Sequence, residues 1–232
     1  MTLLASIPMP ARVVAIDGPA GSGKSSTARA VADALDFAHL DSGALYRAFT
    51  LAAIDHDLPL DGERIAALAG ALPVRLDRTP AGYRPEIAGV DVSEAVRSPA
   101  VTARVSAVAA LPAVRRVVNA MVRAAAAEHP RGVVIEGRDI GTVVFADAGL
   151  KIFLTASPEE RARRRLLQEN RLQDAASVAR EAETLKVRDH ADANRPIAPL
   201  AQAPDAIPLD TTGMGFDEQV RRIVELARKL FP

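Results

Sequence analysis

The chain has 232 residues, of which 49% are hydrophobic, and its 29 basic and 29 acidic residues give a formal net charge of zero at neutral pH. A chain of this length can bury a full core as one domain with inserted subdomains, and its balanced charge gives no bulk electrostatic reason to bind nucleic acid or an anionic membrane. The absence of cysteine excludes disulfides, thiolate nucleophiles and cysteine-ligated zinc.

No targeting or membrane-spanning segment is predicted. The amino-terminal region lacks a basic stretch, and its first strong apolar run is only the four residues Val13–Ile16. No uncharged apolar stretch reaches the length that crosses a bilayer. The four histidines are scattered without the spacing of metal ligands. We therefore expect a cytoplasmic protein without a membrane or nucleic-acid partner.

The first predicted elements are a strand, a glycine-rich loop and a helix. The apolar run Val13–Ile16 predicts a strand, and apolar residues at helical spacing predict a helix over Ser25–Leu35. The loop Gly18–Ser25 matches the pattern G-x-x-x-x-G-K-[ST] without a mismatch. Its glycines let backbone N–H groups turn toward one polyphosphate, Lys24 can reach the terminal phosphates, and the Ser25 hydroxyl can ligate Mg²⁺. Because both flanks agree, the pattern predicts a phosphate-binding loop rather than a glycine-rich turn that happens to carry a lysine.

The next part of the chain changes from one periodicity to another. The short run His39–Asp41 predicts a strand, and the segment Ser42–Asp55 predicts a helix. Between Leu72 and Ser93 the apolar period becomes two, with turn residues at 80–82 and at Gly89. This pattern is typical of a small antiparallel β insert.

Helices and strands then alternate to the end of the chain. Two predicted helices, Pro99–Leu111 and Pro112–Glu128, each begin with proline, which is favoured in the first helical turn. After them come, in order, strands at 133–135 and 150–154, a helix from Pro158, an arginine-rich helical stretch to His190, a strand at 207–209 and a helix over 216–230. Such alternation predicts an α/β fold, a parallel sheet with helices on both faces.

Three polar clusters follow predicted strands, at the edge where open α/β sheets bind ligands. The first is Asp41–Arg47, which also fits a capped helix with a solvated arginine. The second, Glu136–Thr142, follows a wholly apolar strand, where polar residues are costly unless they meet a ligand or each other. The third places Arg188, Asp192 and Arg195 at i, i+4 and i+7 on one helix face, a spacing that a surface salt-bridge ladder also has.

Together the loop and the three clusters resemble the bacterial cytidylate kinases (CMP kinases), a family of nucleoside monophosphate kinases among the P-loop proteins. The resemblance covers nearly the whole chain, and the conjunction of four motifs is far more specific than the loop alone. It implies the P-loop nucleoside monophosphate kinase fold, as a single kinase domain over 1–232 with an inserted monophosphate-binding subdomain at about 72–128 and a lid at about 161–190. The chain departs from the family pattern at Ala146, where we expect proline, and in Gln168–Asp174 of the lid.

The resemblance also implies roles for individual residues. The residues that bind ATP would be Gly18, Pro19, Ala20, Gly21, Ser22, Gly23, Lys24, Ser25 and Ser26, with Ser25 also on Mg²⁺. The residues that bind CMP would be Ser42, Arg47, Ser106, Arg115, Arg138, Asp139, Arg188, Asp192 and Arg195, among which Ser106, Arg115 and Asp139 would read cytosine. The catalytic residues would be Lys24, Arg138, Arg188 and a lid arginine, for which we select Arg164 over Arg161 and Arg165.

The implied reaction is transfer of the γ-phosphoryl group of MgATP to CMP or dCMP by a monomeric enzyme. The acceptor is already an oxyanion, so the chemistry needs positioning and charge neutralisation rather than a general base. A GTPase switch is disfavoured because Asp210–Gly213 fits D-x-x-G but the chain has no N-K-x-D. Intact Lys24 and Ser25 argue against a non-catalytic nucleotide-binding module. Adenylate, uridylate and shikimate kinases remain the alternative enzymes.

Overall fold

The computed structural model describes residues 12–79 and 82–231 of the chain. The chain forms two compact units. Residues 36–133 form unit 1, and residues 13–35 with 134–231 form unit 2. The turn predicted at 80–82 lies largely outside the described residues, because Pro80 and Ala81 are not among them.

Unit 2 is built on a sheet that carries the phosphate-binding loop. Its strands lie in the order β6 (Val133–Gly137), β1 (Val13–Asp17), β7 (Leu150–Thr155) and β8 (Ile207–Asp210). The strand β1 pairs in parallel with β7, with Ile16 opposite Ile152, and β7 pairs in parallel with β8, with Leu154 opposite Leu209. Every residue of β1 is buried, as expected of a central strand in a covered parallel sheet. The predicted α/β fold with a parallel sheet is therefore confirmed.

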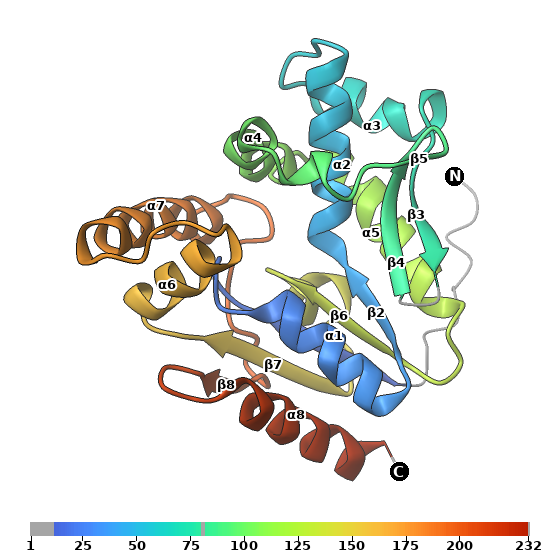
Figure 1. Cartoon of the computed structure of the whole chain (residues 1–232). Coiled ribbons are helices and arrows are strands. Elements are labelled where there is room, and N and C mark those ends of the chain that lie inside the picture. The colour runs from blue at the N-terminus through green and yellow to red at the C-terminus, as the bar shows by residue number, and fades with distance from the viewer. Residues whose placement is uncertain (1–11, 80–81, 232) are drawn as a thin grey trace. The chain divides into compact units, whose positions relative to one another are not determined.

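Two pairs of helices complete unit 2 (Figure 1). They are α1 (Lys24–Leu35) with α8 (Phe216–Leu230), and α6 (Pro158–Gln168) with α7 (Ala175–Ala193). Figure 1 shows α1 and α8 side by side along the sheet, and α6 packs against α7. The helix α6 begins where proline predicts, and the Ser157 hydroxyl caps it by accepting a hydrogen bond from the Glu160 N–H at 3.2 Å.

The end of α7 corrects one prediction. The helix stops at Ala193, and the Asn194 side chain donates to the His190 carbonyl oxygen at 2.8 Å, where it closes the last turn. Leu200 N–H then donates to the Asp192 carbonyl oxygen at 2.9 Å, so the chain has left the helical path. The expectation that Arg195 shares a helix face with residues 188 and 192 is therefore wrong, because Arg195 lies beyond the helix end.

Unit 1 contains a small antiparallel sheet with short helices. The strands of this sheet are β3 (Val74–Thr79), β4 (Gly82–Ile87) and β5 (Val90–Asp91). Unit 1 also contains the strand β2 (Ala38–Asp41), which is not part of the small sheet. Its helices are α2 (Ser42–Asp55), α3 (Gly62–Ala71), η1 (Ala95–Arg97), α4 (Pro99–Ala109) and α5 (Pro112–Ala127). The strands β3, β4 and β5 pair in antiparallel fashion, with Ile87 opposite both Val74 and Val90. The predicted antiparallel insert is thus confirmed, and α4 and α5 both begin at the predicted prolines.

Helix α3 is an element that the sequence pattern did not predict. Its cap is Asp61, whose carboxylate accepts hydrogen bonds from the N–H groups of Glu63 at 3.0 Å and Arg64 at 3.1 Å. Ile65 and Leu68, three residues apart, form its buried side. An acidic cap followed by an apolar pair at helical spacing was the available signal.

One property of the helices bears on membranes. Within the described ranges 12–79 and 82–231, no single helix is long and apolar enough to cross a bilayer. Helices α4 and α5 meet that test only when taken as a pair, and they are bent by 98° to each other.

Candidate active site

The glycine-rich loop follows β1 and lies tightly against the neighbouring strand. Gly18 has a φ of +152°, and a Cβ atom there would lie 2.1 Å from the Leu154 carbonyl oxygen, so no other residue fits. Gly21, with a φ of +74°, also needs the left-handed region. These two glycines let the loop turn sharply from the buried strand into the first turn of α1.

Lys24 is buried inside the loop that it closes. Its ammonium donates to the Pro19 carbonyl oxygen at 2.6 Å and to the Ser22 hydroxyl at 3.3 Å. Burial, together with the positive charges of Arg138 and Arg188, holds the pKa of Lys24 well below its usual value, and the nearby carboxylates oppose this shift only in part. A polyphosphate in the loop would supply the anion that stabilises the charged ammonium.

Ser25 and Glu136 form a pair suited to a divalent cation. The Ser25 hydroxyl donates to Glu136 Oε2 at 2.7 Å, which brings the first turn of α1 to the end of β6. Hydroxyl and carboxylate oxygens are the ligands that Mg²⁺ prefers, with phosphate oxygens and water completing its shell. No group of three or more histidine or acidic side chains that could hold a metal occurs among the described residues. The pair therefore fits Mg²⁺ bound together with a nucleotide.

Glu136 begins the second polar cluster of the sequence analysis, which assigned no role to it. The available signal was an acid at the end of a wholly apolar strand. That strand lies beside β1 in the sheet, an arrangement that only the fold shows.

A buried carboxylate holds the turn that follows β6. Asp17, the last residue of β1, accepts hydrogen bonds from the N–H groups of Ile140 at 2.9 Å and Gly141 at 2.7 Å. Burial raises the pKa of Asp17 to about 6, although the two N–H donors oppose the rise. The π-helical turn Ile140–Val144 begins at this contact and follows directly on Arg138 and Asp139. Asp17 therefore anchors the segment that carries two predicted site residues.

A second carboxylate gathers arginines that lie far apart in the sequence. The Arg138 Nε atom donates to Asp192 Oδ2 at 3.1 Å, and the Arg195 guanidinium lies 3.9 Å from Asp192 Oδ1 and donates to the Ala198 carbonyl oxygen at 2.7 Å. Asp192 is nearly inaccessible to solvent. The structure thus brings together three of the residues assigned to CMP, although Arg195 reaches Asp192 from beyond the helix.

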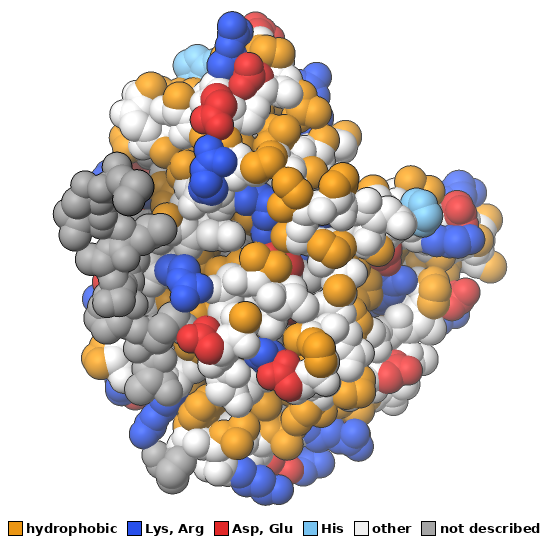
Figure 2. Space-filling view, turned by 180° about the vertical axis from the view of Figure 1, so that it is seen from behind, with side chains coloured by type: hydrophobic (Ala, Val, Ile, Leu, Met, Phe, Trp, Pro, Cys, Tyr) orange, Lys and Arg blue, Asp and Glu red, His pale blue; other side chains and the backbone are white. Residues whose placement is uncertain are grey.

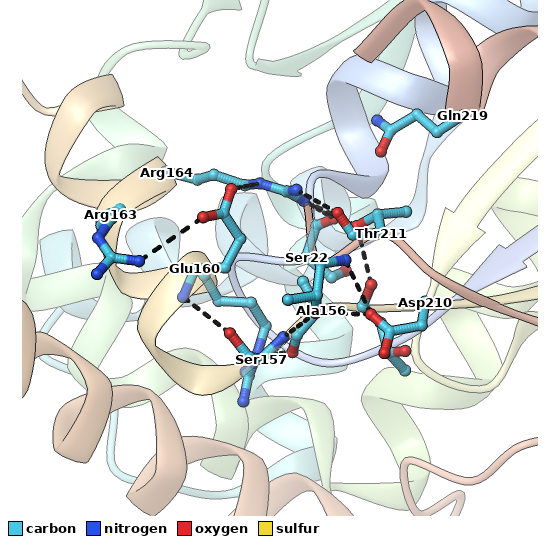
Figure 3. Close-up of polar contacts among 12 residues, drawn as sticks. Ser22, Ala156, Ser157, Glu160, Arg163, Arg164, Asp210, Thr211 and Gln219 are labelled. Atoms are coloured by element: carbon cyan, nitrogen blue, oxygen red, sulfur yellow. Dashed lines mark hydrogen bonds and ion pairs between the residues drawn. The ribbon is translucent and has the colours of Figure 1, made fainter. Parts of the chain in front are cut away.

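The three candidate lid arginines differ in what they contact. Arg164 donates to the Thr211 hydroxyl and carbonyl oxygen, each at 2.9 Å, and to the Ser22 carbonyl oxygen at 3.3 Å. Figure 3 shows its guanidinium pointing toward Thr211 and Ser22, with Glu160 beside it. Arg161 donates to the Ala20 carbonyl oxygen at 2.9 Å. Both contact the phosphate-binding loop.

Arg165 lies elsewhere on the same helix. It pairs with Glu169 at 3.1 Å and Glu181 at 3.0 Å, at the junction of α6 and α7. The segment 210–213, considered above only as a possible GTPase motif, contributes Thr211 to the site through Arg164. Gln219 of α8 was also missed, and it donates to the Thr27 hydroxyl at 2.7 Å.

The predicted site residues of unit 1 lie on the helices α2, α4 and α5. Arg47 of α2 donates to the Val96 carbonyl oxygen and to the Thr102 hydroxyl, each at 3.0 Å. Ser106 lies one turn after Thr102 on α4. Ser42 is the first residue of α2 and is buried.

Arg115 is positioned by two features of unit 1. Its guanidinium donates to the Ala109 carbonyl oxygen at 3.1 Å, and its central carbon lies 5.5 Å from the centroid of the Tyr46 ring. Cation–π contact of this kind restricts a guanidinium to one plane without reducing its charge. The phenol of Tyr46 is itself hydrogen-bonded to Asn119 Oδ1 at 3.3 Å.

The loop, the Ser25–Glu136 pair and the arginines around them define a P-loop phosphotransferase on an α/β scaffold. A family model described as cytidylate kinase matches residues 14–229. The chain is 47% identical over 214 residues to the cytidylate kinase of Desulfitobacterium hafniense (strain Y51), which covers 92% of this chain and 91% of that protein. It is 45% identical over 216 residues to the cytidylate kinase of Rhodococcus jostii (strain RHA1), which covers 91% of this chain and 93% of that protein. The chain therefore belongs to the cytidylate kinase family.

Proposed function

We propose that the protein transfers the γ-phosphoryl group of ATP to CMP or dCMP, giving ADP and CDP or dCDP. Membership of the cytidylate kinase family over residues 14–229 carries this proposal. The intact loop supports it, since Lys24 and the Ser25–Glu136 pair supply the charge and the oxygen ligands that phosphoryl transfer requires.

The donor side of the reaction uses unit 2. Backbone N–H groups of the loop would hold the phosphates of ATP, and Lys24 would leave its neutral acceptors for the terminal phosphate oxygens. Ser25 and Glu136 would hold Mg²⁺, which supplies positive charge to the β- and γ-phosphate oxygens when bound. Arg164 lies at the loop through Ser22 and would add charge on the same side.

The acceptor is an oxyanion that only has to be held in line. Arg138 and Arg188 would neutralise the charge shared between donor and acceptor phosphates in the transition state. Asp192 keeps Arg138 in place before the substrate arrives. Ser42, Arg47 and Arg195 would hold the phosphate and sugar of CMP, as in the family that the chain resembles.

Cytosine would be distinguished from uracil by its hydrogen-bonding edge. Cytosine presents an amino donor beside two acceptors, which suits a carboxylate and a hydroxyl at the amino group and an arginine at N3 or O2. Asp139, Ser106 and Arg115 supply these groups. Uracil would place a carbonyl against the carboxylate, a mismatch of about 1–3 kcal/mol by analogy with base readout in nucleic acids.

The proposal extends to the roles of two segments. Residues 72–128, which include β3 to β5 and helices α4 and α5, would form the monophosphate-binding subdomain. Residues 161–190, from α6 into α7, would form the lid, since they carry Arg161 and Arg164, which contact the loop.

A substrate panel tests the function. The purified protein is assayed with MgATP and, in turn, CMP, dCMP, UMP, AMP and shikimate, with ADP formation as the readout. We expect CMP and dCMP to be phosphorylated with a kcat/KM at least about tenfold above that for the other three. A preference for AMP, UMP or shikimate would contradict the proposal. A Lys24→Ala preparation, purified in the same way, measures any contaminating kinase.

A further inference from the structure

Ala20, in the phosphate-binding loop, is held by the pair of helices α6 and α7. Its side chain lies in an apolar cluster with Ala162 and Leu166 of α6 and Val178 and Leu185 of α7. The side chain is almost completely buried. The loop is therefore docked onto the helix pair at this residue by packing.

Two charged side chains hold the backbone of the same residue. Asp189 Oδ1 of α7 accepts a hydrogen bond from the Ala20 N–H at 2.9 Å, and Arg161 Nη1 of α6 donates to the Ala20 carbonyl oxygen at 2.9 Å. The same Arg161 nitrogen donates to Asp189 Oδ2, and Arg161 Nε donates to the Ala156 carbonyl oxygen at 3.1 Å. We call the pair Asp189 and Arg161 the Ala20 clamp. It grips the two peptide groups on either side of Ala20.

The Ala20 clamp is mostly withdrawn from solvent. The Arg161 side chain is 8% exposed and that of Asp189 is 17% exposed. An ion pair with this burial makes charge-assisted hydrogen bonds that solvent screens little, so its geometry is well defined. Removing one partner would leave the other charge in a site that is poor in water.

The place of Asp189 in the chain links the clamp to the chemistry. Asp189 directly follows Arg188, whose positive charge acts on Lys24, and it precedes Asp192, which holds Arg138, by three residues on the same helix. A rigid helix thus carries the contact with the loop and the groups assigned to the transferring phosphoryl group. The carboxylate also occupies the Ala20 N–H, which leaves phosphate binding to the N–H groups that follow in the loop.

We propose that Asp189 is a positioning residue for phosphoryl transfer, which acts through the Ala20 clamp to fix the phosphate-binding loop relative to Arg188. The inference rests on the proposed kinase function. A carboxylate is required because it accepts the Ala20 N–H and balances the Arg161 charge at the same time. Asparagine can accept the N–H but leaves Arg161 without its counter-charge, and alanine loses both contacts.

Two substitutions and one control test this role. Asp189→Ala should lower kcat by about 30-fold and weaken ADP binding by about fivefold, while the KM for CMP changes less than about twofold. Asp189→Asn should have a kcat and an ADP affinity between those of Asp189→Ala and the wild type. Glu183→Ala, on the same helix but paired at 3.7 Å with the exposed Lys186, should leave all three quantities unchanged. The measurements are steady-state kinetics, titration calorimetry with ADP and thermal melting.

The double variant Asp189→Ala/Arg161→Ala separates positioning from general stability. If the two residues act as one clamp, the fold-losses of kcat and ADP affinity in the double variant should be little more than those of the more affected single variant. They should not equal the product of the two single losses. Unchanged kcat and ADP affinity in Asp189→Ala, or fully multiplicative losses, would overturn the proposal. The proposal would also be overturned if kcat and ADP affinity fell only in proportion to a lower melting temperature. Should Asp189→Ala fail to fold, Asp189→Asn carries the comparison.

The proposed function and the clamp can fail separately. If the wild type does not phosphorylate CMP or dCMP, the proposed function is wrong. The comparison of ADP affinities among the wild type, Asp189→Ala and Asp189→Asn would still decide whether the clamp shapes the loop.

Discussion

The predicted site arginines of the two units donate to different kinds of acceptor. In unit 2, Arg138 donates to a carboxylate, that of Asp192, and the arginines next to the loop are likewise paired with acids. In unit 1, Arg47 donates to a carbonyl oxygen and a hydroxyl, and Arg115 donates to a carbonyl oxygen. A neutral acceptor fixes the direction of a guanidinium without offsetting its charge, whereas a carboxylate does both.

This difference matches the proposed division of labour. Unit 2 must hold several cations around the loop. Burial and, after it, the charges of Arg138 and Arg188 lower the pKa of Lys24, and the acids among these cations oppose that shift. Both signs of charge appear on the molecular surface in Figure 2. The predicted site arginines of unit 1, Arg47 and Arg115, donate to uncharged oxygen atoms, which fix the direction of each guanidinium. We therefore expect unit 2 substitutions to change kcat and unit 1 substitutions to change the KM for CMP.

The largest effect should come from the lysine of the loop. Lys24→Ala should lower kcat/KM by at least about a thousandfold, or about 4 kcal/mol, because no other cation of the loop reaches the terminal phosphates. The melting temperature should not fall, since the buried ammonium is itself disfavoured in the folded protein. Kinetics and thermal melting check both parts. If Lys24→Ala kept activity close to that of the wild type, the role proposed for the loop of unit 2 in phosphoryl transfer would be wrong.

The buried acid of unit 2 should show itself in the pH dependence of stability. Because the pKa of Asp17 rises from 3.8 to about 6 on folding, the folded state binds its proton more tightly than the unfolded state does. Its contribution is therefore most favourable below about pH 4 and declines as the pH rises to about 6, by up to about 3 kcal/mol.

Urea denaturation of the wild type and of Asp17→Asn at several pH values tests this prediction. The unfolding free energy of the wild type relative to the variant should fall between about pH 4 and pH 7. A difference that stays constant with pH would show that burial does not raise the pKa of Asp17, and the account of buried charges in unit 2 would weaken.

A third prediction concerns α7, where a surface salt-bridge ladder was the alternative. Arg188→Ala should lower kcat/KM by about a hundredfold, equivalent to about 2.7 kcal/mol, with little change in melting temperature. Arg180→Ala is the matched control, because Arg180 lies on the same helix and donates to the exposed Ser177 hydroxyl at 2.9 Å. If both variants phosphorylate CMP equally well, Arg188 has no part in transfer.

The smallest effect should come from unit 1. Arg47→Ala should raise the KM for CMP by about tenfold, with kcat reduced less than about threefold, because the lost charge binds the ground state and transition state alike. The KM for ATP should not change. Steady-state kinetics with each substrate varied separately measure the split. A fall in kcat as large as that of Arg188→Ala would erase the proposed difference between the units.

Much of the fold, and the family, could be predicted from short contiguous sequence patterns. The strand, loop and helix around Lys24 could be predicted because the residues that form the phosphate cradle are adjacent in the chain. The antiparallel insert and the proline-initiated helices followed from local periodicity and turn chemistry. The conjunction of four motifs was enough to predict the cytidylate kinase family. Helix α3 had a local signal as well, in Asp61 and the apolar pair behind it.

Only the tertiary structure decided which polar groups meet. Ser25 and Glu136 are 111 residues apart, Asp17 and Ile140 are 123 apart, and Ala20 and Asp189 are 169 apart. No periodicity in a single segment relates such residues, because their contact depends on strand order and on how α6 and α7 pack against the loop. The sequence by itself therefore determined the chemistry that the chain carries, and the folded chain determined which acceptor each site arginine meets, since hydrogen bonds form between neighbours in space.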